Sequence, residues 1–288
     1  MPDGGRARAM CFAEDSMVYI VGGRLQDGSF SSTMLVYNTL TDQWNTKNPP
    51  PITPRVNGTV CTTSQGVYLG LGWANGYIHT DSLYLRDWWH YAPCTNTWTR
   101  LADFPSDKTA AAVSWSDDQY IWVTSGFHGY TNEVWRYDID ANSWSLINPP
   151  APQRVMSPIA AVCNGRYFYG TGFYNHSRSD WWEWLPDGSW ERRSSLPGKG
   201  RHNAACSATS KSVWVFGGWH YGDSLTTGFY YEDILRYTPY NDQWTYCGTI
   251  PCGTTENGVA CAVGDQVYFG LGEDKHGKIH PHWYRIDE

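Results

Sequence analysis

Short apolar runs alternate with polar, glycine-containing turns along the whole chain. The segments at 17–21 (MVYIV), 66–70 (GVYLG) and 212–216 (SVWVF) are rich in β-branched and aromatic residues. Runs of about five residues that are bounded by turn residues are typical of β-strands and too short for helices. The pattern therefore predicts an all-β protein made of many short strands.

A tryptophan in a polar turn marks the same point in each of five repeats. These residues are Trp44, Trp98, Trp144, Trp190 and Trp244, at intervals of 54, 46, 46 and 54 residues. Another aromatic residue comes six or seven positions earlier, at Tyr37, Tyr91, Tyr137, Trp184 and Tyr237. The spacing predicts a strand, a tight turn and a second strand in each repeat, with the two aromatic side chains close together.

Two further features recur in phase with the tryptophans. Glycines end an apolar run at six places: Gly22-Gly23, Gly70 and Gly72, Gly126, Gly170 and Gly172, Gly217-Gly218, and Gly270 and Gly272. A basic residue precedes a strand of small residues at Arg6, Arg55, Lys108, Arg154 and Arg201, and an acidic residue opens the third strand at Asp87, Glu133, Asp180 and Asp233. Because these charged residues recur with the repeat, we interpret them first as scaffold.

This combination of arginine, glycine pair, tyrosine and tryptophan resembles the kelch repeat, as found in the central domain of galactose oxidase and in kelch-fold sialic-acid epimerases. The resemblance covers the chain and implies a six-bladed β-propeller forming a single domain, 1–288. The blades are expected near 6–53, 54–107, 108–153, 154–200, 201–253 and 254–288. Kelch propellers usually complete one blade from both termini, so we expect the sixth blade to lack its outer strand here and an upstream segment to supply it.

The composition excludes some classes of partner. The formal net charge is -7 and the isoelectric point is near 5.7, with no basic run suited to nucleic acid. No stretch of eighteen apolar residues predicts membrane insertion. We expect a soluble protein, secreted or periplasmic if an upstream signal has been removed and otherwise cytoplasmic. The eight cysteines are interpreted as structural thiols, although Cys247 and Cys252 are close enough in sequence to pair.

The loops after the glycines differ from one repeat to the next, and unlike loops on a repeated scaffold are candidates for function. In a kelch propeller they gather at one end of the axis, where aromatic rings and polar groups suit a sugar-like ligand. The predicted ligand-binding residues are Trp73, Asn75, Phe127, His128, Phe173, Asn175, His176, Trp219, His220, Glu273 and His276. The same aromatic residues would also fit as plugs between neighbouring blades.

We predict a binding module for a glycan, another small polar ligand or a peptide, with no metal or other cofactor. The histidines and acids near 273–282 have suitable ligand types for zinc or iron, but a solvated loop explains them as well. A sugar epimerase or mutarotase of the kelch fold is the alternative, with Glu256, His202, His220 and Arg201 as candidate catalytic residues. A protein-interaction propeller is the second alternative. A copper site like that of galactose oxidase has no support in the residues.

Overall fold

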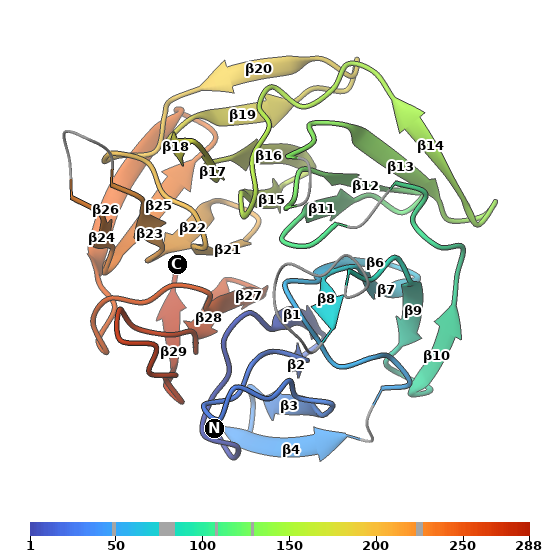
Figure 1. The fold of residues 1–288 in the computed structure, drawn as a ribbon, viewed down its shortest axis with the longest axis horizontal. Coiled ribbons are helices and arrows are strands. Elements are labelled where there is room, and N and C mark those ends of the chain that lie inside the picture. The colour runs from blue at the N-terminus through green and yellow to red at the C-terminus, as the bar shows by residue number, and fades with distance from the viewer. Residues whose placement is uncertain (48–49, 75–83, 107–108, 128–129, 223–226) are drawn as a thin grey trace.

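The strands form six small sheets arranged around a common centre (Figure 1). The computed structural model describes residues 1–47, 50–74, 84–106, 109–127, 130–222 and 227–288. Five sheets have four antiparallel strands and the sixth has three. The prediction of a six-bladed propeller is therefore confirmed.

Each blade runs from an inner strand near the axis to an outer strand on the rim. The inner strands are β1 (Met10–Glu14), β6 (Thr59–Thr63), β11 (Val113–Ser116), β15 (Ile159–Cys163), β21 (Ala205–Ala208) and β27 (Val259–Val263). The second strands are β2 (Met17–Val21), β7 (Gly66–Gly70), β12 (Tyr120–Thr124), β16 (Arg166–Gly170), β22 (Val213–Phe216) and β28 (Gln266–Gly270). The third strands are β3 (Met34–Asn38), β9 (Trp88–Ala92), β13 (Val134–Asp138), β19 (Trp181–Trp184), β25 (Asp233–Thr238) and β29 (Trp283–Asp287). The outer strands are β4 (Gln43–Lys47), β10 (Thr97–Arg100), β14 (Ser143–Ile147), β20 (Trp190–Arg193) and β26 (Gln243–Thr249).

The repeated tryptophan lies directly opposite the repeated aromatic residue of the third strand in all five four-stranded sheets. The ring centroids of each pair are 4.5–5.0 Å apart. The rings also contact the preceding blade: Trp144 lies 5.4 Å from Trp88, and Trp244 lies 5.5 Å from Trp181. Aromatic side chains thus fill the space that widens between blades away from the axis, and burying each one stabilises the ring by about 2–3 kcal/mol.

Buried arginines tie the glycine turns to the third strands. The Arg55 guanidinium donates to both carboxylate oxygens of Asp87 and to the carbonyl oxygen of Leu71. Arg201 makes the same contacts with Asp233 and Gly217. In each of these two blades, the repeated basic residue therefore forms a salt bridge with the repeated acidic residue. This supports our interpretation of these charges as scaffold.

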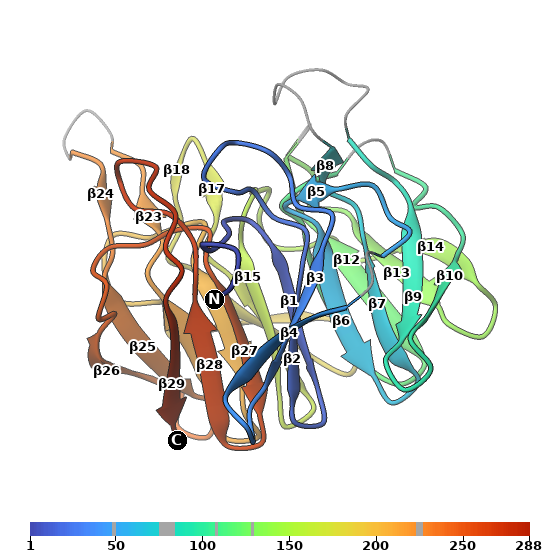
Figure 2. The same ribbon diagram turned by 90° about the horizontal axis from the view of Figure 1, so that it is seen from below.

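Three two-stranded sheets stand at one end of the propeller, and two of them are hairpins (Figure 2). They consist of β5 (Arg55–Val56) with β8 (Trp73–Ala74), β17 (Phe173–Tyr174) with β18 (His176–Ser177), and β23 (Trp219–His220) with β24 (Phe229–Tyr230). Each contains a residue that directly follows a repeated glycine. Unlike loops of three repeats are therefore carried on short two-stranded sheets at one end of a uniform body.

Candidate functional site

Six backbone amides form a closed ring of hydrogen bonds around the axis at the hairpin end. Each N–H donates to the carbonyl oxygen of the equivalent residue in the preceding blade, with donor–acceptor distances of 2.8–3.4 Å. These ring residues are Arg8, Asn57, Ala111, Ser157, Asn203 and Asn257, and each has a positive φ. They line a cavity of about 160 Å³. Because the backbone groups satisfy one another, the chemistry of this axial mouth comes from side chains.

A second circle of residues surrounds the ring. In each blade the residue before the ring residue forms an antiparallel bridge with the residue after the repeated glycines. These rim pairs are Ala7 with Arg24, Val56 with Trp73, Ala110 with Phe127, Met156 with Phe173, His202 with Trp219, and Glu256 with Glu273. The fifth, sixth and first blades thus contribute polar and charged side chains, whereas the second to fourth contribute apolar ones.

Glu273 is the centre of the polar half. Its carboxylate accepts hydrogen bonds from Arg8 (Nε to Oε1, 3.3 Å), from Asn257 (3.0 Å) and from the Arg24 guanidinium. The carboxylate is buried, whereas about a quarter of each arginine side chain is exposed. The two arginines therefore stay accessible at the mouth while one buried carboxylate holds them in place.

Glu256 is buried beside this cluster but has fewer partners. One carboxylate oxygen, Oε2, accepts a hydrogen bond from Asn203 Nδ2 at 2.7 Å. Burial raises the pKa of Glu256, and the nearby Glu273 adds to this, while the bond from Asn203 and the charges of Arg8 and Arg24 act in the opposite direction. Glu256 is therefore more inclined to hold a proton than an ordinary glutamate.

His202 joins the polar half to the aromatic side chains of the fourth and fifth blades. Its ring centroid lies 5.1 Å from those of Phe173 and Trp219. Tyr230 stacks on Trp219 at 5.7 Å. Burial raises the pKa of Tyr230, and the carboxylates of Glu256 and Glu273 raise it further, which locates this phenol beside the acidic pair.

Trp73 and Phe127, on the apolar half, pack mainly against each other and their neighbours. Trp73 is only 6% exposed and belongs to a buried cluster with Val56, Tyr84 and Ala110. The Trp73 and Phe127 rings are 6.4 Å apart. The burial of Trp73 matches the alternative role of these rings as plugs between blades, whereas Phe127, Phe173 and Trp219 keep part of their surface exposed.

The remaining predicted residues are dispersed. Asn175 and His176 are exposed at the tip of the β17–β18 hairpin, and His276 is exposed in a turn. His220 is buried, with Nδ1 3.1 Å from the carbonyl oxygen of Gly200. Arg201 is fully buried and bound to Asp233, so we assign it to the scaffold and no longer to the site. Asn75 and His128 lie outside the described residues.

Arg8 and Tyr230 belong to the cluster but were not predicted from the sequence. Arg8 could have been found, because it is the one cation at a position where the other repeats have Asn, Ala or Ser. Tyr230 carries no such signal, since the length of its loop differs from the other repeats. Arg24 directly follows the first glycine pair and was not among the predicted site residues.

Small and apolar side chains line the rest of the axial channel. Beyond the mouth lie cavities of about 210 Å³ and 320 Å³, bordered by successive levels of the inner strands. Cys11 and Cys61 line the larger cavity as free thiols, and burial raises the pKa of Cys61 to about 12. Cys247 and Cys252 are free as well, so all eight thiols are unpaired. A buried thiol with a raised pKa, such as that of Cys61, is an unreactive packing group.

Neither a metal-binding cluster nor a membrane-spanning helix is found among the described residues. No group of three or more His, Cys, Asp or Glu side chains in this part of the chain is placed to bind a metal ion. Nor do these residues include a helix with the length and hydropathy to cross a membrane.

Known proteins share both the repeat and the ring. The sequence profile of the Kelch motif matches residues 5–51. N-acetylneuraminate epimerase of Escherichia coli (strain K12) is 26% identical over 237 residues, covering 80% of this chain and 57% of the epimerase. Kelch-like protein 23 of Homo sapiens is 25% identical over 258 residues, covering 85% of this chain and 42% of that protein. The chain thus spans about half the length of these curated relatives.

A solved structure has the same fold. The structure of YjhT superposes with a TM-score of 0.82 at 16% sequence identity and covers 99% of this chain and 95% of its own. An identity this low supports the architecture alone. The chain is therefore a six-bladed β-propeller whose residues 5–51 match the Kelch motif, and its sequence is similar to those of kelch-repeat proteins.

Proposed function

We propose that the chain is a recognition module whose axial mouth binds a small polar ligand of the carbohydrate type. The observation that carries this proposal is the meeting of two unlike surfaces at one opening. The partly exposed Phe173 and Trp219 lie beside His202. The neighbouring sixth and first blades contribute the cluster of Arg8, Arg24, Glu256 and Glu273 to the same mouth.

A sugar has two kinds of surface, and this mouth offers a match for each. The C–H face of a pyranose packs on an aromatic ring, while its hydroxyl groups pair with carboxylates, amides and guanidinium groups. The buried salt bridges support the polar side chains before a ligand arrives, which lowers the cost of ordering them on binding.

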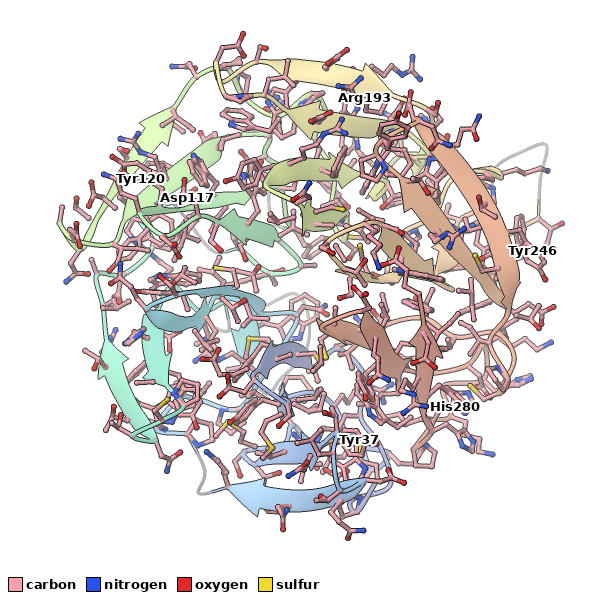
Figure 3. All side chains as sticks on the ribbon, turned by 180° about the vertical axis from the view of Figure 1, so that it is seen from behind. Tyr37, Asp117, Tyr120, Arg193, Tyr246 and His280 are labelled. Atoms are coloured by element: carbon pink, nitrogen blue, oxygen red, sulfur yellow. The ribbon has the colours of Figure 1, made fainter. Side chains whose placement is uncertain are left out.

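The test is a glycan array followed by saturation-transfer NMR with galactose, N-acetylglucosamine and N-acetylneuraminate. We expect at least one sugar to bind, and Trp219→Ala and Phe173→Ala to weaken that binding roughly tenfold or more, because each removes a stacking surface. Tyr246→Ala is the matched control, since Tyr246 is an exposed aromatic residue on the outer strand β26, at the rim of the ring (Figure 3). Thermal melts of each variant show whether the fold is intact. An equal loss of sugar affinity in all three variants would contradict the assignment of Phe173 and Trp219 to the binding site.

Glu256 favours a second candidate, a sugar epimerase or mutarotase. Opening a sugar hemiacetal requires a proton delivered to the ring oxygen and another removed from the anomeric hydroxyl. A buried carboxyl group with a raised pKa, next to two accessible arginines, has the properties of such a proton donor. The similarity to N-acetylneuraminate epimerase supports the same candidate.

Anomer exchange followed by NMR distinguishes the enzyme from the binding module. The epimerase proposal expects exchange of a bound sugar to be accelerated by the wild type and lost in Glu256→Gln, which keeps the size of the side chain but cannot donate a carboxyl proton. Glu191→Gln makes the same change on the outer strand β20 and should leave exchange unaffected. Binding without acceleration would leave the recognition module.

A protein-interaction propeller is the third candidate, in keeping with the similarity to Kelch-like protein 23. The absence of any response in both sugar assays, with folded protein, would make a protein or peptide the better candidate ligand for the mouth.

A further inference from the structure

His202 occupies an unusual position among the titratable groups of the mouth. It is 2% exposed, pairs with Trp219 through the backbone, and its ring centroid lies 5.1 Å from those of Phe173 and Trp219. A buried imidazole in such a place is either a proton-transfer group or a fixed hydrogen-bonding group. The difference depends on which ring nitrogen carries the proton.

Ser177, on β18, indicates where that proton is. Its hydroxyl oxygen lies 3.2 Å from His202 Nδ1 and accepts a hydrogen bond from the backbone N–H of Tyr221 at 2.9 Å. Ser177 is buried, so its O–H group needs an acceptor. Among the described residues the acceptor within reach is His202 Nδ1, and Nδ1 can accept only when it carries no proton.

We propose that His202 is a neutral hydrogen-bond donor at the axial mouth, with its proton on Nε2, and that Ser177 is the residue that positions it. The ligand class that this donor selects is one with an acceptor oxygen, such as a sugar hydroxyl or carboxylate. The ligand part of this inference rests on the proposed function, whereas the tautomer part does not.

The surroundings of His202 favour the neutral form. Burial lowers its pKa to about 4, and the neighbouring His220 and Arg8 contribute in the same direction. At neutral pH the ring therefore carries one proton. Nε2 of His202 has no hydrogen-bond partner among the described residues. It is also not among the polar atoms that are fully shielded from solvent and lack a partner. Nε2 is therefore the nitrogen available to a ligand.

The backbone around Ser177 is held closely against the segment that carries His202. Gly200 has a φ of +90°, and a Cβ at this position would lie 2.5 Å from the carbonyl oxygen of Ser177. The N–H of Arg201 donates to the carbonyl oxygen of Arg178 at 3.0 Å. Only glycine permits this approach, which keeps the Ser177 hydroxyl within reach of the imidazole.

This role differs from the proton-transfer role that the sequence suggested for His202. An imidazole whose pKa lies well below neutrality, and whose Nδ1 is occupied by a serine hydroxyl, is a poor general base at neutral pH. If the mouth performs proton transfer, Glu256 is then the group that carries it. His202 orients the ligand instead.

Long-range ¹H–¹⁵N NMR of the folded protein tests the tautomer. Nine histidines are present in the sequence, and loss of one signal set in His202→Gln assigns the residue. We expect the wild-type spectrum to show a protonated Nε2 and an unprotonated Nδ1. Ser177→Ala should shift the ring toward a mixture of tautomers, and Ser177→Thr, which keeps the hydroxyl, should restore the wild-type pattern. A wild-type signal with the proton on Nδ1, or no change in Ser177→Ala, overturns the positioning role.

The three sugars of the saturation-transfer experiment test the ligand part. We expect Ser177→Ala to weaken the bound sugar roughly tenfold, because the donor loses its fixed orientation, and Ser177→Thr to restore binding. Unchanged binding despite an altered tautomer overturns the role of His202 as a ligand donor. If no sugar binds at all, the proposed function and the ligand part fail together, while the tautomer spectra still decide the role of Ser177.

Discussion

Burial favours the neutral forms of both His202 and Glu256, which face the same mouth with opposite chemistry. The pKa of the imidazole is lowered and that of the carboxyl group is raised, with desolvation as the largest cause in each case. Beside them, the guanidinium groups of Arg8 and Arg24 share the carboxylate of Glu273, which offsets part of their charge. The first two predictions follow from these opposite shifts.

The first prediction concerns His202 below neutral pH. An unfolded histidine has a pKa near 6.5, whereas His202 in the folded protein has a pKa of about 4. Between these values the unfolded chain binds a proton that the folded chain does not, so the folded state loses stability as the pH falls, by up to about 3 kcal/mol at pH 4. His202→Gln, which does not titrate, should lack this loss.

Urea unfolding at a series of pH values from 7 to 4 measures this loss of stability. The gap in unfolding free energy between wild type and His202→Gln should narrow or reverse as the pH falls. His176→Gln alters an exposed histidine on β18 and should follow the wild-type curve. Parallel curves for wild type and His202→Gln would show that the imidazole is not buried in its neutral form.

The second prediction concerns Glu256 and has the opposite sign. Because the folded protein holds this proton to a higher pH than the unfolded chain, stability falls as the pH rises from about 4.5 and levels off above the folded pKa. Glu256→Gln should therefore gain stability relative to wild type over that window. The measurement is the same unfolding series from pH 4 to pH 8, with the exposed Glu191→Gln as control. A constant difference between Glu256→Gln and wild type would argue against a raised pKa.

At the scale of the element, each blade is stabilised by contacts that its own sequence repeats. The third prediction compares the buried pair Arg201–Asp233 with the exposed pair Lys211–Asp265. Asp233→Ala leaves a buried guanidinium without its counter-ion and should reduce the free energy of unfolding by about 3–5 kcal/mol. Asp265→Ala removes a solvated pair and should cost less than about 1 kcal/mol. Guanidinium unfolding of the two variants gives both values, and similar costs would contradict the scaffold role of the arginine.

The elements that the sequence predicted well are those defined by local chemistry. The turn before Trp144 and the apolar run before Gly126 could be located because their residues suit one backbone shape. The two-residue hairpins at the mouth, such as β17–β18, could not be predicted, since their pairing depends on contacts with neighbouring blades. The sequence made Glu256 a candidate because it is the one carboxylate at its position in the repeat. The partnership of Arg8 with Glu273 joins residues 265 positions apart and has no local signal.

At the scale of the whole molecule, the ring closes where the first and sixth blades meet, and this seam differs from the others. The inner strands β1 and β27 are neighbours there, and Trp283 of β29 packs against Tyr37 and Trp44 of the first blade at 6.2 Å and 5.7 Å. Among the described residues the sixth sheet has three strands, and β29 pairs with β28 on one side only. Edge strands lack the hydrogen bonds that an outer strand supplies and open more readily.

The last prediction is that this seam is the weakest point of the ring. Trp283→Ala should reduce the free energy of unfolding by about 3 kcal/mol, and it should also accelerate hydrogen exchange in β1, β3 and β27–β29 more than elsewhere. Trp181→Ala removes the equivalent residue from the fourth blade, where the outer strand β20 covers the third strand. It should reduce the free energy of unfolding by a similar or larger amount. The increase in hydrogen exchange should be less confined to one seam between blades. Hydrogen-exchange mass spectrometry of both variants distinguishes the two patterns. Exchange that rises evenly around the ring in Trp283→Ala would mean that the blades open cooperatively and that the three-stranded sheet is no weaker than its neighbours.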